Sequence, residues 1–194
     1  VRNLHENFGL PCVVAINKFS ADTDAEIALL KNKLAHMQVE VVLAEHWEKG
    51  GEGAEEMARA VLDVIEKCPA NFKFTYEDDT PLWKKMEAVA TRIYGASEVV
   101  ADTKVRNEIK RLQDAGYGSY PICVAKTQYS FSTDAKLLGA PENHVVKVRE
   151  VRLAAGAEFV IIVCGDIMTM PGLPKVPAAN QIDLGDDGQI VGLF

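Results

Sequence analysis

The chain has 194 residues, of which 48% are hydrophobic and 25% charged, a composition typical of a folded globular domain. It excludes a disordered tail, a collagen-like repeat and a disulfide-rich miniprotein. Asp and Glu number 28 against 21 Lys and Arg, and the formal charge of -7 argues against a dedicated nucleic-acid-binding protein.

The first part of the chain predicts a β-α-β unit. Val1–Phe8 is expected to be the tail of a helix, and Pro11–Ile16 is an apolar run typical of a strand buried on both faces of a parallel sheet. Asp22 is the expected N-cap of a helix with apolar residues at helical spacing up to Met37. Val39–Leu43 predicts the next strand, with a right-handed crossover between the two strands.

Three helices are expected to follow. A loop over Ala44–Gly53 precedes an amphipathic helix over Ala54–Lys67. Pro81 begins the second, because proline is well tolerated at the first helical position, and Gly95 ends it. Lys104–Ala115 predicts the third.

The second half of the chain adds strands and a tail. Ile122–Ala125 predicts a buried strand with the polar stretch Lys126–Ser132 at its carboxyl end, and Val145–Leu153 and Phe159–Cys164 predict two more. Gly165–Phe194 is rich in Pro, Gly and Asp and is expected to be irregular. The order of segments indicates an α/β fold with a mostly parallel sheet flanked by helices, mixed at one edge.

Cysteine and histidine spacing predicts no metal site, since no C-x-x-C or similar pattern occurs. The apolar stretches, such as Phe159–Gly165, are far too short to cross a bilayer, and no secretory signal is found, so a cytoplasmic protein is expected. The cysteines are expected to be reduced residues of the core; they are Cys12, Cys68, Cys123 and Cys164.

A strand that ends in Asn17 and Lys18 is the arrangement by which nucleotide-binding α/β proteins recognise a purine, because the Asn amide offers both a donor and an acceptor. A GTP-binding protein would normally add an Asp two residues after the Lys, where this chain has Ser20. A polar strand end that merely caps a turn explains the same residues equally well.

Two aromatic residues, Phe19 and Trp47, follow the first and second predicted strands. The carboxyl ends of parallel strands meet at one edge of a sheet, so the two rings are placed to flank a flat heterocycle. The alternative is that Trp47 packs on its own loop. Glu45, Glu48 and Glu52 lie nearby, and they fit either an amine-bearing ring or a solvated loop.

Lys126–Ser130 presents five consecutive hydrogen-bonding side chains at a strand end, which is more suggestive of a site than of a plain loop. The chain contains no G-x-x-x-x-G-K-[ST] phosphate loop, no nucleophile elbow and no G-x-G-x-x-G fingerprint. The sequence therefore shows no complete set of catalytic residues of these known types.

Several segments together, in one order along the whole chain, resemble the formate–tetrahydrofolate ligase family, also called formyltetrahydrofolate synthetase. They are Ala15–Phe19 (AINKF), Trp47–Gly53 (WEKGGEG), Ala125–Ser132 with Leu137–Gly139, and Gly165–Pro174 (GDIMTMPGLP). Lys175–Ala179 is similar to the bacterial single-function type.

The resemblance implies that residues 1–194 are the C-terminal folate- and nucleotide-binding portion of a longer, P-loop NTPase-like ligase whose phosphate loop lies upstream. The implied reaction is the ATP-dependent ligation of formate to tetrahydrofolate, which gives 10-formyltetrahydrofolate through formyl phosphate. Mg²⁺ accompanies ATP, K⁺ or NH₄⁺ activates, and the complete enzyme is a homotetramer. This chain alone is expected to be inactive, because phosphoryl transfer needs the phosphate loop, its Lys and the magnesium.

The resemblance also implies the site residues. The pteridine ring of the folate is expected between Phe19 and Trp47, beside an apolar wall near Leu43, and Ser20 stands where relatives often have Pro. No catalytic residue or metal ligand is expected within the chain. The nucleotide is expected near Asn17, Lys126, Thr127, Gln128 and Gly139.

Two other readings stay open. One is a binding domain that holds folate or a nucleotide without turnover. The other is a fragment of a GTP-binding protein, which Ser20 and the missing phosphate loop disfavour.

Overall fold

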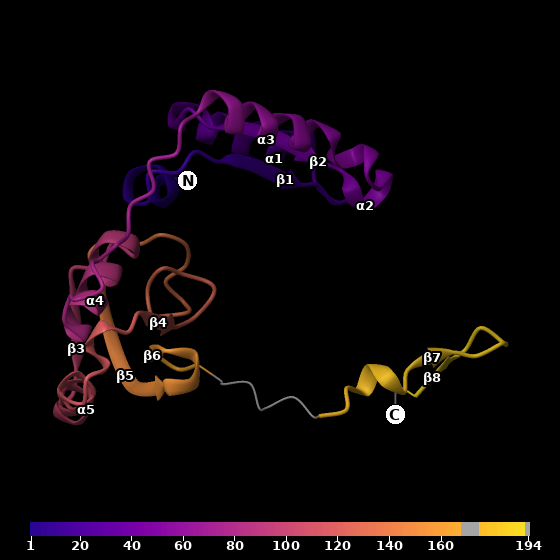
Figure 1. Ribbon diagram of the computed structural model, residues 1–194. Helices are drawn as coiled ribbons and strands as arrows, with labels where there is room; N and C mark the ends of the chain where they lie inside the picture. Colours follow the sequence, from indigo (N-terminus) through magenta and orange to yellow (C-terminus); the bar gives the residue numbers. More distant parts are fainter. Residues whose placement is uncertain (168–174, 193–194) are drawn as a thin grey trace.

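The computed structural model of the chain describes residues 1–167 and 175–192. Figure 1 shows two α/β units along the chain, followed by a small hairpin. In the first unit, strands β1 (Val13–Asn17) and β2 (Glu40–Ala44) form a two-stranded parallel sheet. Helix α1 (Asp24–Leu34) connects them, so the β-α-β order is confirmed. The expectation that the first strand is buried on both faces is wrong, because β1 pairs only with β2 and none of its residues is fully buried.

The N-terminus of α1 differs from the prediction, because its N-cap is Thr23 and not Asp22. The Thr23 hydroxyl accepts from the backbone N–H of Glu26 at 3.3 Å, and the Glu26 carboxylate accepts from the backbone N–H of Thr23 at 2.9 Å. This reciprocal pair is a capping box, which satisfies two otherwise free donors. Asp22 instead accepts from the backbone N–H of Phe19 at 2.8 Å.

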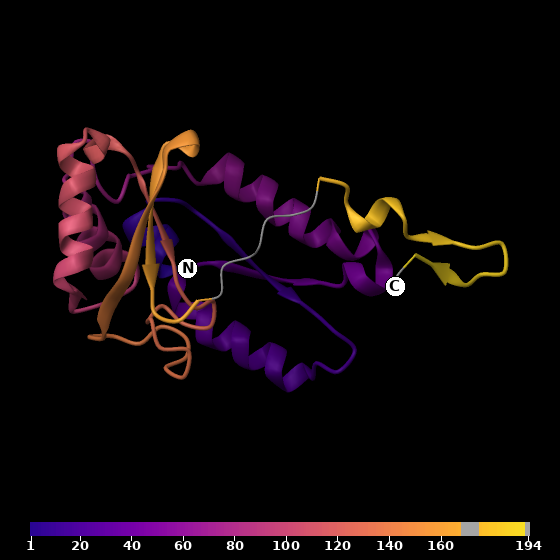
Figure 2. The same ribbon diagram turned by 90° about the horizontal axis from the view of Figure 1, so that it is seen from below.

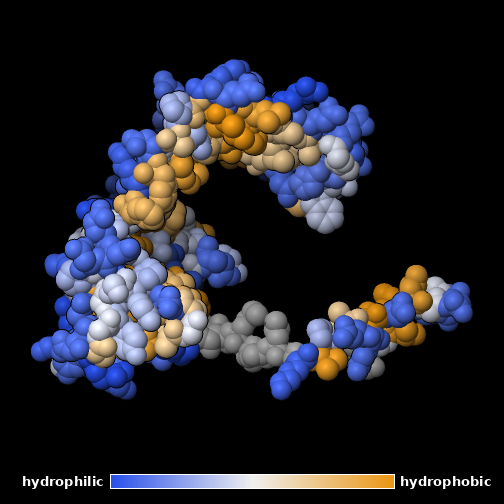
Figure 3. Space-filling model, viewed as in Figure 1, coloured by the Kyte–Doolittle hydropathy of each residue, from blue (hydrophilic) through white to orange (hydrophobic). Residues whose placement is uncertain are grey.

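Helix α3 (Glu55–Lys67) packs against both strands of this sheet, and Figure 2 shows it lying along them. Where they meet, Val42 and Ala44 of β2 and Ala60 of α3 are buried. Its outer residues Leu62 and Ile65 are exposed, and Figure 3 shows apolar surface over this part of the unit. A short helix α2 (His46–Lys49) and the 3₁₀ turn η3 (Glu52–Ala54) occupy the predicted loop before α3.

The second unit holds a four-stranded sheet in the order β3-β5-β6-β4. The β3–β5 and β4–β6 pairs are parallel, whereas β5 and β6 are antiparallel. The three-residue turn η6 (Ala155–Ala157) joins β5 to β6, and a parallel pair would need a longer crossover. The strands are β3 (Glu98–Ala101), β4 (Ile122–Ala125), β5 (Val145–Ala154) and β6 (Phe159–Cys164).

Helices α4 (Leu82–Ala88) and α5 (Thr103–Asp114) pack on this sheet and complete its core. The α/β class, with parallel-rich sheets flanked by helices, is confirmed. The strands nevertheless form separate sheets. The expectation of a sheet mixed at one edge is wrong, because the antiparallel β5–β6 pair lies in the middle of the four-stranded sheet and both edge strands pair in parallel. Strand β3 was not predicted, because its apolar run is only Val99–Ala101. No helix in the described residues is both long and apolar enough to span a membrane.

Lys85 is fully buried in the second unit, and its ammonium group makes three hydrogen bonds there. It donates to the carbonyl oxygens of Asp78 at 2.8 Å, Gly118 at 2.9 Å and Tyr120 at 2.8 Å. Burial lowers the pKa of Lys85, and the charges of Asp78 and Asp79 oppose that shift. The side chain therefore ties two loops to α4 and is structural.

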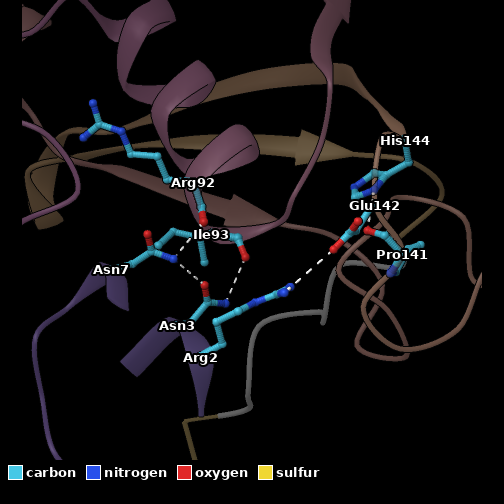
Figure 4. A network of polar contacts seen from close by, with 8 residues as sticks. All are labelled: Arg2, Asn3, Asn7, Arg92, Ile93, Pro141, Glu142 and His144. Atoms are coloured by element: carbon cyan, nitrogen blue, oxygen red, sulfur yellow. Dashed lines mark hydrogen bonds and ion pairs between the residues drawn. The ribbon is translucent and has the colours of Figure 1, made fainter. Parts of the chain in front are cut away.

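Asparagine side chains join the N-terminal π-helical turn η1 (Asn3–Asn7) to the π-helical turn η4 (Val89–Ile93), which directly follows α4. Asn3 Nδ2 donates to the Ile93 carbonyl and Asn7 Nδ2 to the Arg92 carbonyl, both at 2.9 Å (Figure 4). Arg2 lies 3.7 Å from the Glu142 carboxylate in an exposed ion pair. A hollow of about 1010 Å³ adjoins this polar contact.

The described part of the tail, residues 175–192, forms a hairpin of β7 (Asp183–Leu184) and β8 (Ile190–Val191). A turn at Asp186–Gly188 connects its strands, with Gly188 at a φ of 76°. The tail is therefore not irregular throughout, which differs from the expectation based on its composition. Met168–Pro174, the larger part of the GDIMTMPGLP motif, lies outside the described residues.

The prediction that the cysteines are core residues is wrong for two of the four. Cys164 is buried and Cys12 is partly buried, but Cys68 and Cys123 are exposed. Cys123 lies on β4 at the edge of the sheet, and Cys68 is the C-cap residue of α3. An apolar run predicts a strand, but it does not tell which strand lies at an edge.

Thiol labelling at neutral pH tests this arrangement. Burial raises the pKa of the Cys164 thiol to about 12, so it stays protonated and shielded, and we expect it to react only when the chain is unfolded. Cys68 and Cys123 should react in the folded chain, as measured by peptide mass mapping after alkylation. Labelling of Cys164 as fast as Cys123 in the folded chain would contradict the structure.

Candidate functional site

The structure brings Phe19 and Trp47 together at one end of the two-stranded sheet, as the sequence predicted. Asn17 pairs in register with Ala44, so both strands end at the same level. The backbone N–H of Lys18 donates to the Ala44 carbonyl at 3.1 Å, which extends the pairing by one residue. The two ring centroids lie 5.9 Å apart with an interplanar angle of 42°.

Both rings are open to solvent, which argues against the alternative that Trp47 is a packing residue. Trp47 is 71% exposed and Phe19 is 50% exposed. An indole is usually largely buried when its role is packing. The pair therefore presents aromatic faces that a flat ligand can cover.

The spacing of the rings sets a condition on binding between them. Aromatic carbon atoms in contact lie about 3.5–4 Å apart, so a flat ring between two others needs about 7 Å. The present centroid distance of 5.9 Å and the tilt place the rings in contact with each other. A heterocycle must therefore separate them by side-chain rotation, which their exposure allows.

Close backbone packing shapes the loop that carries Trp47. The Gly53 carbonyl accepts from the backbone N–H of Glu45 at 3.0 Å, which closes the loop onto the end of β2. A Cβ atom on Gly53 would lie 2.5 Å from the Glu45 carbonyl, so only glycine fits there. On the other segment, the Asp22 hydrogen bond holds the backbone of Phe19.

Leu43 belongs to the same sheet end, on β2 opposite Ile16. It is partly buried, while its neighbours Val42 and Ala44 are fully buried beneath α3. Successive strand residues point to opposite faces, so Leu43 lies on the face away from α3. That position is compatible with the expected apolar wall.

The residues proposed for the nucleotide are divided between the two units. Asn17 is exposed at the end of β1, whereas Lys126, Thr127 and Gln128 follow β4 in the other sheet. Figures 1 and 2 both show the α2 end of the first unit pointing away from the four-stranded sheet. The described structure therefore does not assemble one pocket from both groups.

Within the second unit, Gly139 does lie beside the polar segment. Phe131 N donates to the Gly139 carbonyl at 2.8 Å, and Gly139 N donates to the Tyr129 carbonyl at 3.1 Å. The Lys126 ammonium group turns inward, where it donates to the carbonyls of Thr127 and Ser130.

The Nζ of Lys126 also lies 5.0 Å from the centroid of the Tyr94 ring. Burial lowers the pKa of Lys126. The ammonium group of Lys126 therefore makes its contacts with groups of the same unit.

The sequence analysis missed the hydrogen bonds that organise the aromatic pair. In the sequence, Glu45 is only one of three acids near Trp47, yet its carboxylate binds Lys18 and Lys49. Nothing in the local pattern distinguishes it from Glu48 and Glu52. In the residues that the structure describes, no three His, Cys, Asp or Glu side chains gather into a metal-binding group.

Comparison with known proteins gives a consistent picture. The family model of formate–tetrahydrofolate ligase matches residues 1–194. The formate–tetrahydrofolate ligase of Methylibium petroleiphilum is 59% identical over 197 residues, which covers 100% of this chain and 35% of that protein. The ligase of the same name from Pelagibacter ubique is 52% identical, with 97% of this chain and 34% of that protein covered. The chain thus spans about a third of the length of these relatives.

Replacing Gly53 by Ala tests whether the loop requires glycine. The added methyl group would overlap the Glu45 carbonyl, so we expect a loss of about 1–3 kcal/mol of stability, typical of overpacking. Thermal unfolding of the chain measures it. Gly51→Ala is the matched control, because Gly51 has a φ of -61° and open space around its Cβ position. Equal melting temperatures for the two variants would contradict the described loop.

Proposed function

The chain belongs to the formate–tetrahydrofolate ligase family, and on that premise we propose that it supplies the folate-binding part of an ATP-dependent ligase. The observation that carries the proposal is the exposed Phe19–Trp47 pair at the shared end of two parallel strands. A flat pteridine gains from contact with two aromatic faces. Leu43 supplies apolar surface at the same sheet end.

In the proposed reaction, a formate oxygen attacks the γ-phosphorus of ATP and ADP leaves, which gives formyl phosphate. The N10 amine of tetrahydrofolate then attacks the formyl carbon, phosphate leaves, N10 releases its proton, and 10-formyltetrahydrofolate results. N10 lies on the bridge beside the pteridine, so a ring held between Phe19 and Trp47 fixes N10 relative to the activated carbon. Positioning is thus the contribution that we assign to this chain.

The phosphate chemistry is placed outside residues 1–194. The chain has no Walker-type Gly-Lys-Thr, and its described acids form no cluster suited to Mg²⁺. Nor do we assign the nucleotide to the Lys126 segment, because the ammonium group is already bound within the fold. The P-loop NTPase-like architecture is therefore proposed for the complete ligase.

Adenine is also flat, so the nucleotide base is the competing occupant of the aromatic pair. Asn17 is exposed at the same sheet end and offers a donor and an acceptor to a base edge. The tetrahydrofolate assignment is preferred because the pair has apolar surface beside it, at Leu43 on the same sheet end.

Trp47→Ala separates the two occupants. The variant is made in the complete Methylibium petroleiphilum ligase with this chain in place of its matching segment. Loss of one stacked face removes about 1–3 kcal/mol, so the KM for tetrahydrofolate should rise about ten- to a hundredfold while the KM for ATP stays unchanged. Steady-state kinetics measures both constants.

Phe74→Ala is the control, because Phe74 is 78% exposed and lies outside the candidate site. It should leave both constants unchanged. Tetrahydrofolate should also quench the fluorescence of Trp47, and Trp47→Phe should abolish that quenching. A rise in the KM for ATP alone would assign the pair to the nucleotide, and a fall in melting temperature alone would make Trp47 a packing residue.

A further inference from the structure

One carboxylate connects the two segments that carry the aromatic rings. Glu45 is the first residue after β2. Its Oε1 lies 3.2 Å from the Nζ of Lys18, the residue before Phe19. Its Oε2 lies 2.6 Å from the Nζ of Lys49, on the short helix that carries Trp47. The carboxylate thus bridges the end of β1 and α2.

Glu45 is itself held in place by its backbone. Its N–H donates to the Gly53 carbonyl at 3.0 Å, and its carbonyl accepts from the backbone N–H of Lys49 at 3.0 Å. The side chain therefore extends from a fixed point of the loop. Residue 53 must be glycine for this packing, because a Cβ atom there would overlap the Glu45 carbonyl.

The bridge is shielded more than an ordinary surface ion pair. The side chains of Glu45 and Lys18 are 23% and 30% exposed, and Lys49 is 47% exposed. The Lys49 hydrogen bond, followed by that of Lys18, lowers the pKa of the Glu45 carboxyl. Glu45 is consequently ionised at neutral pH and binds both lysines at once.

The sheet alone does not fix the two rings. Backbone pairing stops at Lys18, one residue before Phe19, and at Ala44, three residues before Trp47. Beyond that point, Lys18 to Glu45 is the one hydrogen bond between the two segments among the described residues, and the two rings are also in contact. A ligand that parts the rings removes the ring contact, and the Glu45 bridge stays.

We infer that Glu45 is a positioning residue of the folate site. Its carboxylate holds the Lys18–Phe19 segment and α2 at the spacing at which the two rings accept a pteridine. The inference rests on the proposed function, and it adds a residue that does not touch the ligand.

Glu45→Gln in the same complete ligase tests it. Gln has a single acceptor oxygen, and its NH₂ group is unsuited to an ammonium partner, so at least one lysine is released. We expect the KM for tetrahydrofolate to rise about five- to tenfold, while kcat and the KM for ATP change less than about twofold. Lys49→Met breaks the bridge from its other end and should give a rise of the same order.

Glu48→Gln is the matched control. It removes the same charge three residues further along the chain, within α2, but Glu48 is exposed and does not bridge the segments. Its KM for tetrahydrofolate should equal that of the parent, which separates local positioning from a general change of charge.

Two outcomes overturn the inference. One is an unchanged KM for tetrahydrofolate in both Glu45→Gln and Lys49→Met while Trp47→Ala raises it, which leaves the folate site standing. The other is a parallel rise in the KM values of all substrates with a lower melting temperature, which makes Glu45 merely structural. If Trp47→Ala also has no effect, the proposed function itself fails.

Discussion

Parallel pairing of β1 with β2 is the interaction on which the candidate site depends. Its register places Asn17 opposite Ala44, so the chain leaves both strands at one level and carries Phe19 and Trp47 into contact. A slip of one residue would reverse the face of every side chain on the slipped strand. Leu43 would then exchange places with the residues that α3 covers, and the apolar wall would be lost.

The exposure of the two aromatic rings costs the free chain stability and favours ligand binding. Two large rings that remain in water forgo the free energy that burial would give, about 25 cal/mol for each Å² of apolar surface. A ligand that covers them recovers part of that free energy, so a surface unfavourable for the free chain favours binding. The Glu45 bridge complements this, because it orders the segments before the ligand arrives and reduces the entropy lost on binding.

The sequence predicted the convergence of Phe19 and Trp47 because that required only two strand assignments and the rule that parallel strands end at one edge. It did not predict the inward turn of Lys126, which depends on Tyr94 and on carbonyl groups placed by the tertiary fold. The exposure of Cys123 likewise follows from the position of β4 at a sheet edge. The role of Glu45 depends on two lysines that lie 27 residues before it and 4 residues after it in the chain.

A crystal structure of the complete ligase with bound tetrahydrofolate tests the central claim most directly. The account predicts that the centroids of Phe19 and Trp47 move from 5.9 Å to about 7 Å, with the pteridine between the rings and Glu45 still bound to Lys18 and Lys49. Rings that remain in mutual contact while the pteridine binds elsewhere would contradict it.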